Sequence, residues 1–392
     1  MLGVPPKIVY LPCGSCVPVS ILAARNLKKR LGINFLPPTP VYLPVNLLLA
    51  FVWAFAVSVF AIPSIIQVAH AKKLLNEPNG RSMHALLTPR LGGMAIFAGF
   101  VSALAIFGRL EQGIQYVLAG AILLFFIGLK DDIVPVSAFK KFFVQLLATG
   151  IIVFMGDVRI TSFQGLFGIY GVETGISYAF TIIVIIGITN AINLIDGLDG
   201  LAGTNLVIIA GAFGVYFLLQ GQMVYSYAAV SLIGGTLGFL RYNFHRAVIF
   251  MGDAGSLTCG FIIAVMAVQF TEMHPAENTP LLALGILYVP LLDTLRVSVM
   301  RLLAGKSPFA ADKNHIHHCL IHAGLTQLQV VGALSVLHLL VIAFIIVSAP
   351  WGMHTQLAFL TVFSLAASLV LNWMGKQDWK KSPVQTEGIA AE

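Results

Sequence analysis

Long apolar runs recur along most of the chain, and they limit the folds that it can adopt. Eleven predominantly apolar segments of about 15 to 27 residues can be drawn, most of them long enough to cross about 30 Å of hydrocarbon. They lie near 43–69, 91–109, 114–129, 141–155, 175–192, 201–219, 223–240, 255–271, 279–300, 326–349 and 355–374. Because the runs are continuous rather than alternating, they predict helices and not the strands of a barrel. We therefore expect an all-α, polytopic integral membrane protein with about eleven transmembrane helices.

Composition points to the same class. Hydrophobic residues make up 58% of the 392 residues and charged residues only 10%, and the mean hydropathy is +0.90. A soluble domain with a large core does not reach these values, so the chain is expected to be embedded in a membrane. We expect residues 41–375 to form one transmembrane domain, residues 1–40 an N-terminal extension and residues 376–392 a cytoplasmic tail.

The basic residues predict an orientation. If the first span runs from outside to inside, only Arg109 and Arg159 among the Lys and Arg after residue 40 face outward. The positive-inside rule therefore favours this orientation in the cell inner (plasma) membrane. The net charge of +7 suits anionic membrane lipids and a phosphorylated substrate, and it requires no nucleic acid as a partner.

The first 40 residues fit this scheme least well. Their basic cluster at 25–30 would lie outside, against the rule that the rest of the chain obeys. Two explanations stay open: residues 8–24 act as a weak extra span or signal-like element, or the start codon is assigned too far upstream. Cys13 and Cys16 have the spacing of a redox or metal motif, but one such pair without further ligands is a weak signal.

Polar residues follow one long apolar run at every third position: Asn190, Asn193, Asp196 and Asp199. A step of three falls about 60° short of a helical turn, so four such side chains cannot all face one ligand from a regular helix. Glycines within 197–200 supply a break. We predict a helix end that opens into a glycine loop and directs carboxylates at a cation or polar ligand. The alternative is a glycine-rich helix contact with capping Asn and Asp.

Other acids gather at the same predicted membrane face. Asp131 and Asp132 follow the third apolar run, and two adjacent carboxylates repel each other unless a cation lies nearby. Asp253 stands between glycines at the start of the eighth run. Each acid alone could be a helix cap, but their shared position predicts one catalytic surface on the cytoplasmic side.

The last cytoplasmic loop supplies basic and imidazole groups. It contains Arg301 and then His315, His317 and His318. Closely spaced histidines can bind zinc, but Asp312 is the only nearby carboxylate in the sequence, so a zinc site is disfavoured. Arginine, lysine and histidine donors beside a carboxylate-bound cation are better suited to a pyrophosphate and the hydroxyls of a sugar.

Five motifs in order resemble those of the polyprenyl-phosphate N-acetylhexosamine-1-phosphate transferases, in particular the undecaprenyl-phosphate N-acetylglucosaminyl-1-phosphate transferases. They are Arg81-Ser-x-His84 with Thr88-Pro-Arg-Leu-Gly-Gly93, Gly128-Leu-Lys-Asp-Asp132, Asn190-Ala-Ile-Asn-Leu-Ile-Asp-Gly-Leu-Asp-Gly200, Phe250-Met-Gly-Asp-Ala-Gly-Ser-Leu257 and His315-Ile-His-His318. The resemblance covers about residues 41 to 375. It implies dependence on Mg²⁺, with Mn²⁺ as an alternative, and compatibility with a homodimer. The implied substrates are a UDP-sugar and undecaprenyl phosphate, and the products are a lipid-linked sugar diphosphate and UMP.

The resemblance also implies roles for single residues. Asn193 and Asp253 would be the magnesium ligands, and Asp131 and Asp132 the catalytic pair that activates the lipid phosphate. The substrate-binding residues would be Lys141 for phosphate, Asp196, Asp199 and Phe250 for the nucleotide, and Arg301, His315, His317 and His318 for pyrophosphate and sugar. Within the nucleotide site, Phe250 would stack on the uracil and Asp199 would accept hydrogen bonds from it. The chain departs from the family pattern in the first cytoplasmic loop, where an acid usually stands two residues before a proline and this chain has Asn76.

The chemistry itself favours phosphoryl transfer. Mg²⁺ prefers oxygen ligands and keeps bound waters, so one or two protein groups and the substrate diphosphate are sufficient. We expect Asp131 to take a proton from the lipid phosphate, which attacks the β-phosphorus of UDP-N-acetylglucosamine in line and releases UMP. A two-step route through an aspartyl-phosphate stays open.

Two other functions are less consistent with the sequence. A membrane transporter would place its charged groups near the bilayer midplane in two repeated halves, whereas these groups cluster at one surface. A muramoyl-pentapeptide phosphotransferase is the alternative within the family, but Ser307-Pro-Phe309 and Asp312 before His315 resemble the N-acetylglucosamine-type relatives. The product is expected to initiate a cell-envelope polysaccharide, such as a lipopolysaccharide or cell-wall polymer, and the sequence does not determine which.

Overall fold

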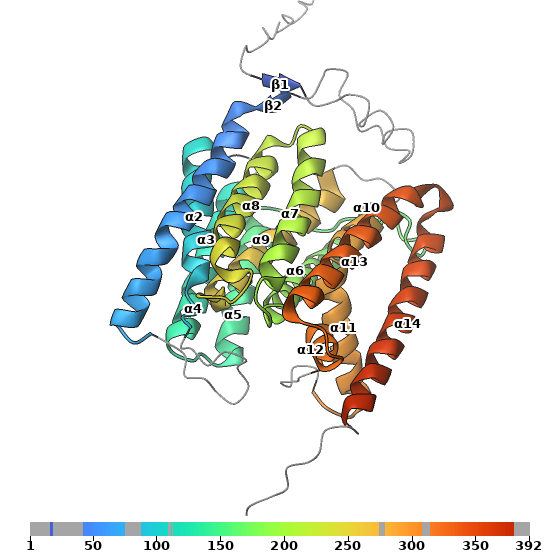
Figure 1. Ribbon diagram of the computed structural model, residues 1–392. Helices are drawn as coiled ribbons and strands as arrows, with labels where there is room; N and C mark the ends of the chain where they lie inside the picture. The colour runs from blue at the N-terminus through green and yellow to red at the C-terminus, as the bar shows by residue number, and fades with distance from the viewer. Residues whose placement is uncertain are drawn as a thin grey trace, which may run out of the picture.

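The computed structural model describes residues 16–18, 42–74, 88–108, 111, 113–273, 279–307 and 314–379, and it shows a bundle of long helices (Figure 1). Most of the N-terminal extension, the Arg81–His84 motif and Asp312 lie outside the described residues. Two short strands, β1 (Cys16–Pro18) and β2 (Tyr42–Pro44), pair antiparallel at the end of the bundle where the first long helix begins.

Each of the eleven apolar runs forms a helix or a pair of helical segments. The helices of these runs are α2 (Val45–Ala71), α3 (Gly92–Phe107), α4 (Ile114–Ile133), α5 (Ala138–Gly150) continued by a π-helical turn (Ile151–Met155), α6 (Thr174–Leu194), α7 (Leu201–Leu219), α8 (Met223–Asn243), α9 (Gly252–Met273), α10 (Thr279–Ile286), α11 (Tyr288–Leu303), α13 (Gln327–Val347) and α14 (Met353–Trp379). Two short helices, α12 (Ile316–His322) and a 3₁₀ turn (Ala349–Trp351), lie in connections. The all-α architecture predicted from the sequence is confirmed.

Within the described residues, nine helical segments are long and apolar enough to cross a membrane by themselves. The bent pair α10–α11 is a tenth candidate, and α3 is a shorter apolar helix of 16 residues. Consecutive long helices alternate in direction, so the ends of α4 and α6 lie at the same end of the bundle as the starts of α5 and α9 (Figure 1). The chain is a multi-pass membrane protein.

Helix α9 is the centre of the bundle. Of the 18 residues in the apolar stretch of α9, 94% are buried inside the protein, whereas only 17% are buried in the corresponding stretch of α14. Gly128 of α4 lies against the backbone of Asp253 and Ala254, and Gly93 of α3 lies against Gly255, so that a side chain at either glycine would overlap with α9. In lipid, small residues allow helices to pack this closely. The result is that α3 and α4 both meet the first turn of α9.

The ninth apolar run is not one straight span, and the prediction of a single helix over 279–300 is wrong. Helix α10 ends at Ile286, α11 begins at Tyr288, and the two are bent by 80°. Pro290 lies in the first turn of α11. A proline lacks the N–H that would bond the carbonyl four residues earlier, and its ring clashes with that turn, so it breaks a helix. Hydropathy alone does not register this break, because both arms are apolar.

Candidate active site

Backbone hydrogen bonds tie the entry of α9 to the entry of α3. The N–H of Phe250 donates to the carbonyl of Pro89 at 2.9 Å. In return, the N–H groups of Gly92 and Gly93 donate to the carbonyls of Phe250 and Met251, at 2.9 and 2.8 Å. Two of the sequence motifs are therefore one structural unit. These backbone bonds hold Phe250 in place. Its stacking on uracil stays a prediction.

The first turn of α9 is fixed by Gly252 and Asp132. Gly252 has a φ of +74°, and a side chain there would overlap the carbonyl of Arg90 and the carboxylate of Asp132. The two oxygens of Asp132 accept the backbone N–H groups of Asp253 and Ala254, at 2.8 and 2.9 Å. A carboxylate at a helix N-terminus satisfies free N–H groups and the helix dipole. The catalytic role of Asp132 stays a prediction, and its contacts are those of a helix cap.

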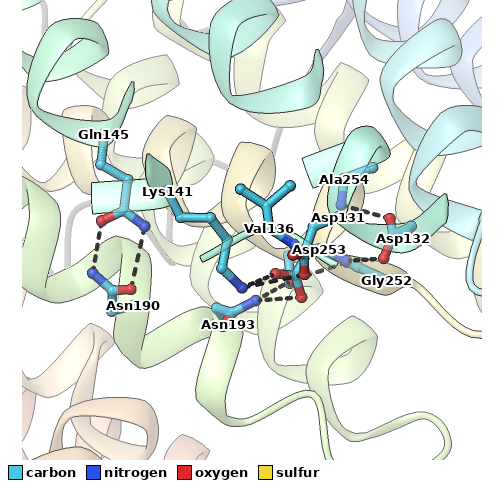
Figure 2. Close-up of polar contacts among 11 residues, drawn as sticks. Asp131, Asp132, Val136, Lys141, Gln145, Asn190, Asn193, Gly252, Asp253 and Ala254 are labelled. Carbon is cyan, nitrogen blue, oxygen red and sulfur yellow. Dashed lines mark hydrogen bonds and ion pairs between the residues drawn. The ribbon is translucent and has the colours of Figure 1, made fainter. Parts of the chain in front are cut away.

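Four side chains, the aspartate cluster, meet in front of α9 (Figure 2). The Lys141 ammonium lies 2.9 Å from Oδ2 of Asp253 and 3.2 Å from Oδ2 of Asp131. Asn193 donates through Nδ2 to Oδ1 of Asp253 at 3.3 Å and to Ser256 at 2.7 Å. The side chains of Lys141, Asp131 and Asp253 are 26%, 19% and 25% exposed. The charged groups of the cluster are thus open to a ligand.

A pair of amides holds the cluster together one helical turn away from it. Gln145 of α5 and Asn190 of α6 exchange two hydrogen bonds of 2.9 and 3.2 Å (Figure 2). Gln145 follows Lys141 by one turn, and Asn190 precedes Asn193 by one turn, so each lies on the same helix face as its neighbour. The pair holds α5 and α6 in the register that brings Lys141 and Asn193 to Asp253.

The aspartate cluster has the donor chemistry of a magnesium site. Two carboxylates and the amide oxygen of Asn193 are hard oxygen donors, which both Mg²⁺ and Mn²⁺ prefer. The position between Asp131 and Asp253 already attracts a cation, the Lys141 ammonium. Within the described part of the chain, no group of three or more His, Cys, Asp or Glu side chains is arranged to hold a metal. Substrate phosphates and waters would therefore have to complete the coordination.

The glycine loop, residues 195–200, follows α6 as predicted and is tied to the end of α8 and the segment after it. Asp199 is 4% exposed and accepts the N–H of Ala247 at 3.0 Å. The N–H of Gly200 donates to the side chain of Asn243 at 2.8 Å. These bonds fix the loop, and the acceptance of a hydrogen bond from uracil by Asp199 stays a prediction.

Asp196 lies in a different environment from its neighbour in the loop. Its side chain is partly exposed, yet loss of surrounding water raises its pKa to about 7, and the negative charges of Asp253 and Asp199 add to the rise. Arg90 opposes the shift. The charge of Asp196 therefore changes near neutral pH.

The histidine loop, residues 314–318, is held by two residues of α11 that sequence analysis left without a role. Nδ1 of His315 lies 2.9 Å from Oδ2 of Asp293, and the N–H of Ile316 donates to Oδ1 of Asp293 at 2.7 Å. Arg296, one turn later, donates to the carbonyl of Asn314 at 2.6 Å. Both charged side chains are buried. Opposite charges at this spacing inside an apolar run are the signal that could have identified them.

His317 connects the histidine loop to the glycine loop. A side chain at Gly197 would overlap the His317 imidazole, so the ring packs directly on that backbone. It also stacks with His315, with ring centroids 5.7 Å apart, and lies 4.4 Å from His318. Burial, and then the neighbouring His318, lower the pKa of His317 to about 3. The ring is neutral at neutral pH, so its predicted contact with pyrophosphate would be a hydrogen bond rather than a charge interaction.

All twelve predicted site residues lie in the described part of the chain, and eight of them fall into two groups. The aspartate cluster comes from α4, α5, α6 and α9, whereas the histidine loop and the buried Arg301 come from α11 and α12. The contact between Gly197 and His317 joins the groups. The individual roles of the twelve residues stay predictions.

Comparison with known proteins shows the family to which the chain belongs. The model of glycosyl transferase family 4 matches residues 114–271, which contain the whole aspartate cluster. A Bacillus subtilis (strain 168) protein named "Probable undecaprenyl-phosphate N-acetylglucosaminyl 1-phosphate transferase" is 33% identical over 303 residues, which cover 77% of this chain and 83% of that protein. The chain belongs to glycosyl transferase family 4.

Other relatives of this family 4 chain have related names. The undecaprenyl-phosphate alpha-N-acetylglucosaminyl 1-phosphate transferase of Yersinia pestis is 31% identical over 65% of this chain and 72% of its own length. The decaprenyl-phosphate N-acetylglucosaminephosphotransferase of Mycobacterium tuberculosis (strain ATCC 25618 / H37Rv) is 32% identical over 70% of this chain and 76% of its own length. The family resemblance predicted from five motifs is confirmed, and the chain is a membrane-embedded transferase.

Proposed function

We propose that the protein transfers N-acetylglucosamine 1-phosphate from UDP-N-acetylglucosamine to undecaprenyl phosphate and releases UMP. The names of its relatives in Bacillus subtilis and Yersinia pestis support the acceptor and the sugar phosphate. The structural observation that carries the proposal is the Lys141 ammonium between the carboxylates of Asp131 and Asp253. A partly exposed ammonium group and two carboxylates at the end of a membrane bundle could bind the diphosphate of the UDP-sugar next to the phosphate of a membrane lipid.

The metal would be held by Asp253 and Asn193. Asn193 donates through Nδ2 to Asp253 and Ser256, so its Oδ1 is the atom left for a cation. When bound, Mg²⁺ or Mn²⁺ neutralises charge on the diphosphate and polarises the phosphoryl group. The nucleotide would lie near Asp196, Asp199 and Phe250.

In the proposed step, an oxygen of the lipid phosphate attacks the β-phosphorus of the UDP-sugar in line. A bond forms between them, the bond from the β-phosphorus to the bridging oxygen breaks, and UMP leaves with that oxygen. Asp131 would accept the proton of the lipid phosphate. Its Oδ2 is engaged by Lys141, and its Oδ1 accepts the N–H of Val136 at 2.6 Å. Lys141 must therefore turn from Asp131 to the incoming phosphate before the carboxylate can act as a base.

We further propose that the site end of the bundle faces the cytoplasm at the cell inner membrane. The distribution of basic residues supports this, because Arg159 is the one basic residue in the segment between α5 and α6. That segment lies at the end opposite the site, where Thr161 donates to Glu272 at the far end of α9, at 2.6 and 2.9 Å. In intact cells, an impermeant thiol reagent should modify Tyr170→Cys, which replaces an exposed side chain at that end, and spare Lys306→Cys at the site end. The reverse pattern would overturn the orientation.

Product analysis tests the reaction. Purified protein with undecaprenyl phosphate, Mg²⁺ and UDP-N-acetylglucosamine should release UMP and a lipid-linked sugar diphosphate in equal amounts. An Asp253→Asn sample prepared in the same way controls for contaminating enzymes. Transfer only from UDP-muramoyl-pentapeptide would refute the choice of sugar, and movement of an intact solute without UMP would favour a transporter.

A further inference from the structure

A histidine lies inside the apolar bundle, away from both groups of site residues. His338 of α13 is 0% exposed, and both of its ring nitrogens lie near polar atoms. Nε2 lies 2.7 Å from the carbonyl of Ile286, and Nδ1 lies 3.0 Å from the side-chain oxygen of Asn205. An ionisable side chain within a membrane span is costly, so it points to a role for the contacts that it makes.

The carbonyl of Ile286 needs a donor from another helix. It belongs to the last residue of α10, and the residue four positions later is Pro290, which has no N–H. Ile286 is 2% exposed, so water does not replace the missing donor. Because a carbonyl only accepts, Nε2 of His338 must carry the proton in this bond. His338 thus completes the hydrogen bonding of the break between α10 and α11.

The second neighbour of His338 lies at the start of α7, next to the glycine loop. Asn205 is 0% exposed and donates through Nδ2 to the carbonyl of Leu201 at 3.0 Å. Leu201 is the first residue of α7 and directly follows the loop that contains Asp196 and Asp199. With its proton on Nε2, His338 can only accept at Nδ1, and Oδ1 of Asn205 also only accepts, so this contact is one of packing and not a hydrogen bond. It places His338 against the start of α7.

We propose that His338 is a positioning residue for the transferase reaction, because its hydrogen bond to the carbonyl of Ile286 fixes the direction in which α11 leaves the break. Through Asp293 and Arg296, α11 holds the histidine loop. That loop in turn packs on the glycine loop. A change in the bend would therefore move the histidine loop relative to the aspartate cluster. The kinetic part of this inference rests on the proposed function, whereas the geometric part does not.

Four variants separate the two contacts of His338. In His338→Gln the amide nitrogen can reach the position of Nε2 and still donate to the Ile286 carbonyl. In His338→Asn the shorter amide can reach Asn205 but not Ile286, and His338→Leu makes neither contact. Leu339→Ala is the matched control, since that side chain is on the same helix and 54% exposed.

Two measurements are made on each variant. Spin labels on Leu303→Cys in α11 and Leu340→Cys in α13, which replace side chains 84% and 62% exposed, report the distance between the two helices. Cys13 and Cys16 are first changed to Ser, while Cys259 and Cys319 are buried. The second measurement is UMP release per folded molecule, with the Mg²⁺ concentration required for half-maximal rate.

We expect the label distance to shift in His338→Asn and His338→Leu and to stay at the wild-type value in His338→Gln and Leu339→Ala. The two shifted variants should show a kcat about 10-fold or more below wild type, because misplaced groups contribute less to the reaction. Their Mg²⁺ requirement should not change, since the aspartate cluster does not move. A purely structural role would reduce the yield of folded protein and leave kcat per folded molecule unchanged.

An unchanged label distance in both His338→Asn and His338→Leu would overturn the proposal, whatever the activity. It would also be overturned if His338→Asn matched wild type while His338→Gln did not. Should wild-type protein release no UMP, the proposed function fails, and the distances still decide whether His338 sets the bend. Should His338→Leu fail to fold, the comparison of Gln with Asn decides alone.

Discussion

The aspartate cluster and the histidine loop use charge in opposite ways. In the cluster, the side chains of Asp131, Asp253 and Lys141 are between 19% and 26% exposed. In the histidine loop, the paired side chains of His315 and Asp293 are 7% and 3% exposed. A partly exposed charge can exchange its partner for a ligand, whereas removing the partner of a buried charge leaves it without compensation. The aspartate cluster is therefore suited to catalysis, whereas the contacts between the histidine loop and α11 are suited to holding the loop in one conformation.

Substitution at Asp253 should have the largest effect. Asp253→Asn keeps the shape but removes the charge that faces Lys141 and the proposed cation, and we expect turnover to fall by about 1,000-fold or more. UMP release at ordinary Mg²⁺ measures this, with thermal stability as a check on folding. Asp157→Asn is the control, since Asp157 is a 71% exposed acid at the opposite end of the bundle. Near-normal turnover by Asp253→Asn would remove the cluster from the chemistry.

A comparison of two adjacent lysines, Lys140 and Lys141, tests whether the contacts within the aspartate cluster matter for turnover. Lys141→Met should lower kcat by about 100-fold, because the ammonium that would neutralise phosphate charge is lost. Lys140→Met, one residue earlier on the exposed face of α5, should have little effect. Rates with saturating UDP-sugar and lipid phosphate make the comparison. Equal losses in the two variants would mean that the general positive charge of this surface matters, rather than the contact with Asp131 and Asp253.

Two aspartate substitutions test the comparison most directly. Asp131→Asn should lower kcat by about 10- to 100-fold and leave thermal stability and the Michaelis constant for the UDP-sugar nearly unchanged, because a base is lost from an open site. Asp293→Asn should lower both kcat and the melting temperature, because a buried partner of His315 is changed. Full stability of Asp293→Asn would show that the histidine loop does not depend on this pair.

The smallest expected effect concerns pH. The pKa of Asp196 rises from 3.8 to about 7 on folding, so between these values the folded protein binds more protons than the unfolded chain. Stability should therefore fall as the pH rises from about 4 to 7, and Asp196→Asn should flatten this trend. Because the side chain is partly exposed, we expect a difference below about 1 kcal/mol. Melting temperatures in detergent at several pH values measure it, and an equal slope in both proteins would contradict the assignment.

Sequence reasoning succeeded where the signal is local. Apolar runs gave the helices because hydropathy and length decide whether a segment crosses a membrane. The glycine loop after Asn193 could be predicted because glycine is unfavourable inside a helix and readily adopts the backbone conformations of a turn. The same reasoning could not distinguish Asp131 from Asp132. One contacts Lys141 and the other caps α9, and this depends on where a helix more than a hundred residues later begins.

The sequence by itself determined the membrane class, the helices, the end of the bundle that carries the acids, and the family. Tertiary structure alone decided which polar groups meet. It paired Gln145 with Asn190, placed Asp293 under His315, and brought His338 to the carbonyl freed by Pro290. The physical reason is that the apolar character of a segment can be summed along the chain. A hydrogen bond between distant residues instead requires its two atoms to be placed to within a few tenths of an ångström, and only the packed bundle sets their positions.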